Sequence, residues 1–217
     1  MEQDILQQNK LLAERNRGYF EGRNILALNL VSSPGSGKTS LLERTLTDLK
    51  GELDFAVIEG DQRTTRDADR IHATGTKVTQ INTGKGCHLD AHMVLHALKG
   101  MKPHPDSVLF IENVGNLVCP SMFDLGEAER VVIISVTEGD DKPIKYPDMF
   151  ASSTLCIINK TDLLPYVPFD LEACRNYIHQ VKPGMPILEL SCSSGEGMGA
   201  WYDWLKSKVH AGEPAHA

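Results

Sequence analysis

The sequence predicts a single α/β domain, with a mostly parallel sheet of about seven strands and helices on both faces. Short and almost uninterrupted apolar runs recur along the chain, as expected of strands that are buried on both faces. Segments with a helical spacing of apolar residues separate these runs, and this alternation is typical of parallel strands. The chain of 217 residues is long enough for one such domain with a sizeable core.

The composition excludes several classes of protein. A formal net charge of −7 argues against general binding to nucleic acid or to anionic membranes. No apolar run approaches the length of a membrane span, and the polar, acidic start MEQDILQQNK does not resemble a signal peptide. The five scattered cysteines suit a reducing compartment better than a disulfide framework. We therefore expect a cytoplasmic protein without nucleic-acid or membrane partners.

Three segments are expected along the chain. Residues 1–22 are predicted to form a helix packed on the domain, residues 23–210 the domain itself, and residues 211–217 a frayed tail. The first segment has only a weak apolar stripe, made of Ile5, Leu6, Leu11, Leu12 and Ala13.

The first predicted strand, residues 25–31, runs into the glycine-rich loop SSPGSGKT and then into a helix. This order is the setting of a phosphate-binding P-loop, although a simple glycine turn is the alternative and Ser32 stands where the general pattern has Gly. Gly35 and Gly37 allow backbone N–H groups to approach a polyphosphate, and the helix start near Lys38 adds its positive dipole end. Lys38 is expected to reach the β- and γ-phosphates, and the Thr39 hydroxyl to ligate Mg²⁺. The nucleotide-binding residues predicted here are Gly35, Ser36, Gly37, Lys38, Thr39 and Ser40.

The remaining elements follow the same alternation. The further predicted strands are 54–59, 77–81, 107–112, 131–136, 154–158 and 187–190, and the further predicted helices are 87–98, 169–181 and 198–209.

Two of these strands end beside acidic residues. Asp61 follows the second strand and is expected to hold Mg²⁺ directly or through water, with a helix N-cap as the alternative. Glu112 ends the strand 107–112, where small GTPases usually carry Asp, and the amide of Gly115 is expected to reach the γ-phosphate. The predicted catalytic set is Lys38, Thr39, Asp61 and Glu112. No arginine finger or glutamine base is identifiable, so we expect slow hydrolysis.

The motif NKTD follows the strand 154–158 and indicates guanine recognition through Asn159, Lys160 and Asp162. The Asp162 carboxylate can accept hydrogen bonds from the ring N–H and the exocyclic amine of guanine, which adenine does not match. We therefore predict GTP and GDP rather than ATP as ligands. Two further sets extend this site: Ser191 and Cys192 as a loop touching the base, and Lys142 and Lys145 as residues that reach phosphate or base across a dimer, or else lie in a solvated loop.

A second group of residues suits a transition metal. Cys87, His88 and Cys119 lie in polar, glycine-rich contexts, where a thiolate or an imidazole fits Ni²⁺ or Zn²⁺ better than Mg²⁺. The expected helix start beside Cys87 favours thiolate, although single buried cysteines usually pack as small hydrophobes. Three ligands leave a site incomplete, and two chains related by a two-fold axis could share one. His92 is a possible fourth ligand, because it follows His88 by one helical turn.

The sequence resembles the HypB family of hydrogenase nickel-incorporation GTPases over about residues 16–204. The resemblance rests on the following segments: LNLVSSPGSGKTSLL, VIEGDQ, GKGCHLDAHMV, FIENVGNLVCP, SVTEGDDKPIKYP and INKTDLLP. It implies a GTP-hydrolysing metallochaperone that dimerises with GTP and helps to load nickel into the large-subunit precursor of [NiFe]-hydrogenase. A HypA-type zinc/nickel protein is an implied partner. The N-terminal cysteine motif or histidine-rich tract of some members does not occur here, so a nickel-storage role is not expected.

Three alternatives differ from this interpretation. UreG, the urease accessory GTPase, has a similar fold, but its metal motif is Cys-Pro-His and its switch segment differs from ENVGNLVCP. A P-loop kinase acting on a small molecule would share the phosphate loop without needing the NKTD motif or the Cys-His pair. A binding module that sequesters metal would show no GTP hydrolysis.

Overall fold

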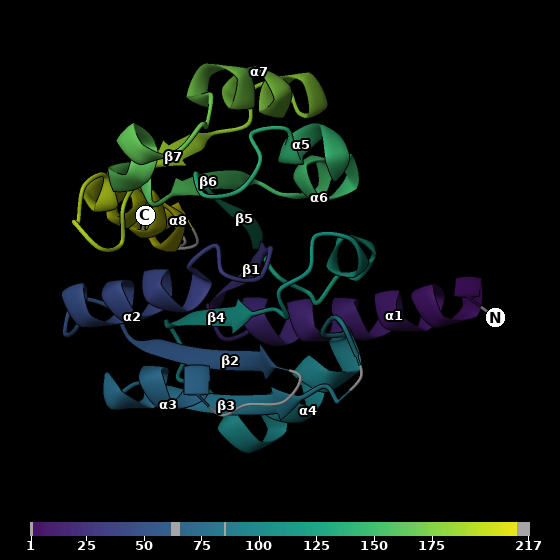
Figure 1. Cartoon of the computed structure of the whole chain (residues 1–217). Helices are drawn as coiled ribbons and strands as arrows, with labels where there is room; N and C mark the ends of the chain where they lie inside the picture. Colours follow the sequence, from purple (N-terminus) through teal and green to yellow (C-terminus); the bar gives the residue numbers. More distant parts are fainter. Residues whose placement is uncertain (1, 62–65, 85, 212–217) are drawn as a thin grey trace.

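The computed structural model describes residues 2–61, 66–84 and 86–211 and contains a seven-stranded, entirely parallel sheet (Figure 1). The strand order is β3-β2-β4-β1-β5-β6-β7. The strands are β1 Leu26–Ser32, β2 Phe55–Asp61, β3 Lys77–Asn82, β4 Val108–Glu112, β5 Glu129–Ser135, β6 Leu155–Asn159 and β7 Ile187–Glu189. This confirms the predicted fold class.

The helices cover both faces of the sheet. The α-helices are α1 Glu2–Glu21, α2 Lys38–Asp48, α3 Arg66–Ala73, α4 Ala91–Met101, α5 Lys142–Lys145, α6 Pro147–Ser152, α7 Leu171–Val181 and α8 Met198–Ala211, and the 3₁₀ helices are η1 Cys119–Met122 and η2 Thr161–Tyr166. The core clusters assign α2, α3 and α8 to one face and α1, α4, α6 and α7 to the other. No helix in the described ranges has both the length and the apolar character to span a bilayer.

The alternation of side chains along β1 explains this two-sided core. Leu28 and Leu30 pack with the residues of α2 and α8, whereas Ala27 and Val31 belong to the clusters on the opposite face. A parallel strand buried on both sides is mostly apolar, which is why these segments read as nearly continuous apolar runs.

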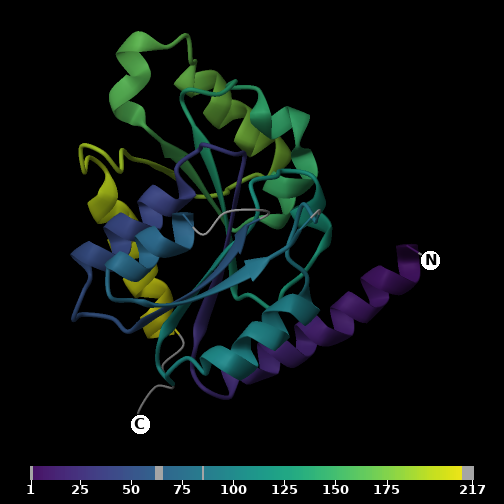
Figure 2. The same cartoon turned by 60° about the horizontal axis from the view of Figure 1, so that its bottom comes forward.

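Helix α1 lies alongside α4, and its N-terminal half extends beyond the rest of the domain (Figure 2). The predicted apolar stripe is only partly correct, because Ile5 and Leu11 are exposed. The buried residues of the helix include Asn9 and Asn16, and the Asn16 side chain donates to the backbone oxygens of Ala91 and Leu125 at 2.9 and 3.0 Å. Amide hydrogen bonds therefore help to fix this helix on the domain, together with the buried Ala13 and Phe20.

Other boundaries also differ from the predictions. Strand β2 extends to Asp61, so this carboxylate lies on the strand end and not beyond it. The two short helices α5 and α6 occupy a segment in which no element was expected, each with Pro within its first two positions. The predicted tail, residues 211–217, falls outside the described residues from position 212 onward.

Candidate nucleotide and metal site

A cavity of about 490 Å³ lies where β1, β2 and β4 end. Its walls come from the loop between β1 and α2, the end of β2, α3, the residues after β4, and Lys160. Parallel α/β sheets bind ligands at the carboxyl ends of their strands, where the strand order reverses on either side of β1. The sheet therefore brings together segments that are far apart in the sequence.

The phosphate loop forms the floor of this cavity. Gly37 has φ +100°, and a Cβ at this position would clash with the Asn159 side chain, so both the backbone conformation and the space require glycine. Lys38 Nζ donates to Ser32 Oγ at 2.8 Å, which gives a role to the serine that departs from the general pattern. Burial lowers the pKa of Lys38.

The Mg²⁺ candidates Thr39, Asp61 and Glu112 all line the cavity. Thr39 Oγ1 donates to Glu112 Oε1 at 2.7 Å, and Glu112 Oε2 is buried without a hydrogen-bond partner. Burial raises the pKa of Glu112. A hydroxyl and carboxylate oxygens are the ligands that Mg²⁺ prefers, and the unpartnered oxygen leaves one position open for it, so these residues fit the cation.

Glu59 is a further acidic residue of the cavity that the sequence did not point to. It lies two residues before Asp61 on β2 and is 2 % exposed, and its Oε2 has no hydrogen-bond partner. Burial raises the pKa of Glu59 to about 8, with smaller contributions from the charges of Glu112 and Asp61. The sequence did contain a signal for Glu59. Side chains two positions apart in a strand point to the same face, so Glu59 shares a face with Asp61.

Asn159 connects the phosphate loop to the loop after β7. Its Nδ2 donates to the backbone oxygen of Ser36 at 2.9 Å, and its Oδ1 accepts from the backbone N–H groups of Lys160 and Cys192. Lys160 has φ +64°, and its Nζ donates to the backbone oxygen of Gly35 at 2.8 Å. The first two residues of the NKTD motif thus hold the phosphate loop and the loop after β7 in place.

Asp162 has a buried Oδ1 without a hydrogen-bond partner. Since an unpartnered buried carboxylate oxygen is costly, this atom is available to a ligand that offers N–H donors. Ser191 is buried, and Cys192 is half-buried and donates its backbone N–H to Asn159 of the same NKTD motif. Burial raises the pKa of Cys192 to about 11.

The two lysines after β5 have different surroundings. Lys142 Nζ donates to Ser33 Oγ at 3.2 Å, next to Glu138, which accepts from Ser36 Oγ at 2.5 Å. Lys145 pairs with Asp141 at 2.7 Å and its side chain is 60 % exposed. Lys142 therefore contacts the phosphate loop, while Lys145 does not line the cavity within this chain.

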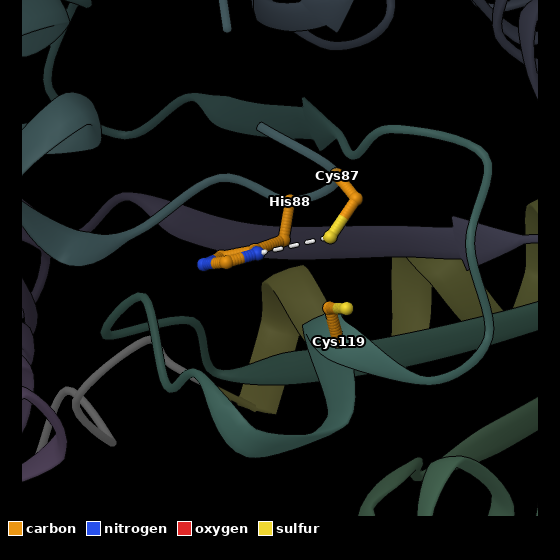
Figure 3. A group of neighbouring side chains, drawn as sticks. All are labelled: Cys87, His88 and Cys119. Carbon is orange, nitrogen blue, oxygen red and sulfur yellow. Dashed lines mark hydrogen bonds between the residues drawn. The ribbon is translucent and has the colours of Figure 1, made fainter. Parts of the chain in front are cut away.

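Cys87, His88 and Cys119 form one cluster, in which one ligand atom of each residue lies within 4.8 Å of the others. Figure 3 shows the Cys87 and His88 side chains, from the segment before α4, beside Cys119 at the start of η1. Cys87 Sγ lies 3.6 Å from His88 Nδ1, and the His88 ring stacks on Phe123. Burial lowers the pKa of His88. Two sulfur atoms and one imidazole are a donor set for a borderline-soft cation.

Two expectations about this cluster are wrong. Helix α4 begins at Ala91 with Asp90 as its N-cap, so Cys87 and His88 precede the helix and the one-turn relation between His88 and His92 does not hold. His92 is exposed on α4 and lies outside the cluster. The expected thiolate is also not favoured in the metal-free state, because the hydrogen bond with Cys119, and then burial, raise the pKa of Cys87.

Hydrogen bonds connect the cluster of Cys87, His88 and Cys119 to the nucleotide cavity. Asn113, which lines the cavity, accepts from the backbone N–H of Leu89 at 3.0 Å through its Oδ1. Asn116 Nδ2 donates to the backbone oxygen of Cys87 at 3.3 Å. Gly115 packs against Pro34 of the phosphate loop, where a Cβ would approach the proline Cα at 3.0 Å. The segment after β4 therefore touches both sites.

The parallel sheet, the phosphate loop and the base-side motif define a P-loop nucleotide-binding protein. A family model described as the nucleotide-binding domain of CobW/HypB/UreG matches residues 26–189. The hydrogenase maturation factor HypB of Rhizobium leguminosarum bv. viciae is 59 % identical over 206 residues, covering 95 % of this chain and 69 % of the relative. The chain therefore belongs to the CobW/HypB/UreG family and, within it, to the HypB hydrogenase maturation factors.

Two solved structures agree with this assignment. HypB from Archaeoglobus fulgidus matches with a TM-score of 0.87 and 41 % identity, covering 94 % of this chain and 99 % of the other. HypB from Helicobacter pylori, solved in complex with nickel, matches with a TM-score of 0.88 and 38 % identity, covering 97 % and 99 % of the two chains. These similarities favour the HypB interpretation over the kinase and UreG alternatives.

Proposed function

We propose that the protein is a GTP-hydrolysing metallochaperone that binds nickel or zinc and assists nickel insertion during maturation of [NiFe]-hydrogenase. The main observation in support is that one segment, residues 113–119, lines the nucleotide cavity at one end and contributes a thiol to the metal cluster at the other. A change at the γ-phosphate position can therefore reach the cluster through direct contacts. The free cysteines of the described chain suit the cytoplasm as its location.

The nucleotide site supports guanine recognition and phosphate binding. Lys38 and the backbone of the phosphate loop would hold the phosphates, and the unpartnered Oδ1 of Asp162 would accept from guanine. Thr39, Asp61 and Glu112 would hold Mg²⁺, which neutralises phosphate charge when bound. Arg70 lines the cavity but pairs with Glu43 and Asp67, so it does not act as an evident arginine finger and we expect slow turnover.

The metal cluster supports transient binding of nickel as cargo. Cys87, His88 and Cys119 supply three ligands, one fewer than a closed tetrahedral site needs. A second copy related by a two-fold axis would bring the same three residues and complete a shared site. We propose that GTP promotes this dimer, that hydrolysis releases nickel, and that a HypA-type protein and the large-subunit precursor of the hydrogenase are the partners.

The base-recognition part of the proposal is tested by Asp162→Asn. This variant should bind GDP at least about 100-fold more weakly, because the amide presents a donor where guanine also has a donor. Xanthosine diphosphate, which has a carbonyl in place of the exocyclic amine, should bind the variant better than it binds the unmodified protein. Fluorescence titration with labelled nucleotides measures both affinities. Equal binding of GDP and ADP by the unmodified protein would contradict guanine recognition.

A further inference from the structure

Two buried carboxylate oxygens of the nucleotide cavity have no hydrogen-bond partner. They are Oε2 of Glu59 and Oε2 of Glu112, whose residues are only 2 % and 3 % exposed. Unpartnered carboxylate oxygens at this depth are rare, because desolvation is then uncompensated. Both residues line the same cavity, so a bound group can reach both.

The sheet places these two residues side by side. Glu59 on β2 pairs in register with Glu112 on β4, and neighbouring strands lie about 4.8 Å apart. Register partners in parallel strands point to the same face, which is here the face toward Thr39 of α2. Asp61, two residues after Glu59, points to this face as well.

The neighbouring basic side chains do not fully neutralise Glu59 and Glu112. Lys38 Nζ, in the same cavity, donates to Ser32 Oγ. Arg70 of α3 pairs with Glu43 at 2.5 Å and with Asp67 at 3.6 Å. Two adjacent buried carboxylates repel each other strongly at low dielectric, and a divalent cation between them offsets that repulsion.

We propose that Glu59 belongs to the Mg²⁺ site, where it and Glu112 hold the cation, or a water bound to it, between β2 and β4. This inference rests on the proposed GTPase function and adds to it a residue that was not among the predicted site residues. Glu59 then contributes to metal affinity at the nucleotide site, while ionisation of its buried carboxyl group is unfavourable in the protein without metal.

The test compares Glu59→Gln with Glu129→Gln, a matched control. Glu129 also has a buried Oε2 without a partner, but it lies at the opposite end of its strand, where it pairs with Lys208 at 2.6 Å. Mn²⁺ serves as the probe, and electron paramagnetic resonance measures its affinity for the GDP complex. We expect about tenfold weaker Mn²⁺ binding in Glu59→Gln and no change in Glu129→Gln.

The midpoint of thermal unfolding in EDTA is the second readout. Gln replaces a carboxyl group whose ionisation is unfavourable in the metal-free protein, so the midpoint of Glu59→Gln should stay unchanged or rise, whereas a purely structural role would lower it. If Glu59→Gln does not fold, Glu59→Asp, which retains the charge on a shorter side chain, should bind Mn²⁺ more weakly than the unmodified protein.

Two results would overturn the inference alone. Unchanged Mn²⁺ affinity in Glu59→Gln with slower GTP hydrolysis would place Glu59 at the attacking water, and unchanged affinity with normal hydrolysis would leave it no role at the site. Failure of the unmodified protein to bind GDP in the presence of Mn²⁺ would overturn the proposed function, and this inference with it.

Discussion

At the scale of single residues, Asn159 fixes the loop after β7 against the phosphate loop. Its Oδ1 accepts from the backbone N–H of Cys192, which holds this half-buried cysteine beside the NKTD motif. Because burial raises the pKa of Cys192 to about 11, its thiolate is scarce at neutral pH.

The alkylation rate of Cys192 should therefore depend on pH in a characteristic way. In a variant with Cys87→Ser and Cys119→Ser, iodoacetamide labelling of Cys192 should rise by about tenfold per pH unit from pH 8 and level off only near pH 11. Mass spectrometry of the peptide that contains Cys192 measures the rate, and the fully buried Cys156 provides an unlabelled reference. A rate that levels off near pH 9 would show an unperturbed thiol.

The nucleotide-site residues that could be predicted from the sequence belong to short motifs, which specify the residues around them. Lys38 and Thr39 follow a glycine loop, and the NKTD motif follows a strand, so chain order alone places them at one edge of a parallel sheet. Glu59 and Asn113 belong to no such motif. Their roles depend on the pairing of β2 with β4 and on the approach of Asn113 to Leu89, neither of which a single sequence specifies.

At the scale of elements, the segment that follows β4 links the two sites. Asn113 accepts from the backbone of Leu89, directly after His88, and donates through Nδ2 to Asn29 of β1 at 3.2 Å. Leu89 also packs closely on Gly60 of β2, where a Cβ would lie 2.8 Å from its side chain. The ends of β2 and β4 therefore both contact Leu89, the residue directly after His88.

Asn113→Ala should weaken the coupling between nucleotide and metal. The ratio of Ni²⁺ affinities in the GDP and GTP-analogue states should approach one, and the free energy of unfolding should fall by about 1–3 kcal/mol, because the backbone N–H of Leu89 loses its partner. Isothermal titration and urea unfolding measure the two effects.

Asn9→Ala is the matched control for this prediction. Asn9 is also a buried asparagine that accepts from a backbone N–H, that of Ala91 at 2.8 Å, but it lies on α1 and does not line the nucleotide cavity. A comparable loss of stability with unchanged coupling is expected. If the two variants changed the affinity ratio equally, the coupling could not be assigned to Asn113.

The boundaries of elements were predicted less well than their order. The start of α4 was expected at Cys87, yet the helix begins after Asp90, whose side chain accepts from the backbone N–H of Met93. An aspartate followed by helical spacing is an N-cap signal, and it competed here with the glycines before Cys87. Because the helix begins a few residues later than predicted, Cys87 and His88 lie in a loop and not in the helix. The argument for His92 as a ligand therefore no longer holds.

At the scale of the whole molecule, the parallel sheet was predictable because alternating apolar strands and helices leave few other arrangements. This topology gathers the phosphate loop, the acidic strand ends and the NKTD motif at one edge of the sheet. The metal cluster lies against the same edge through residues 113–119. Its formation from two segments more than thirty positions apart follows from the packing of the loop before α4 against η1.

The most direct test of nucleotide-controlled metal binding is a titration of Ni²⁺ into the metal-free protein, once with GDP and once with a non-hydrolysable GTP analogue. Molecular mass is measured alongside, and Cys119→Ser serves as the control for the cluster. We predict that the Ni²⁺ affinities of the two states differ by at least about fivefold, that the analogue favours the dimer, and that Cys119→Ser abolishes the difference. Equal Ni²⁺ affinity and equal mass in both states would contradict a GTP-driven metallochaperone.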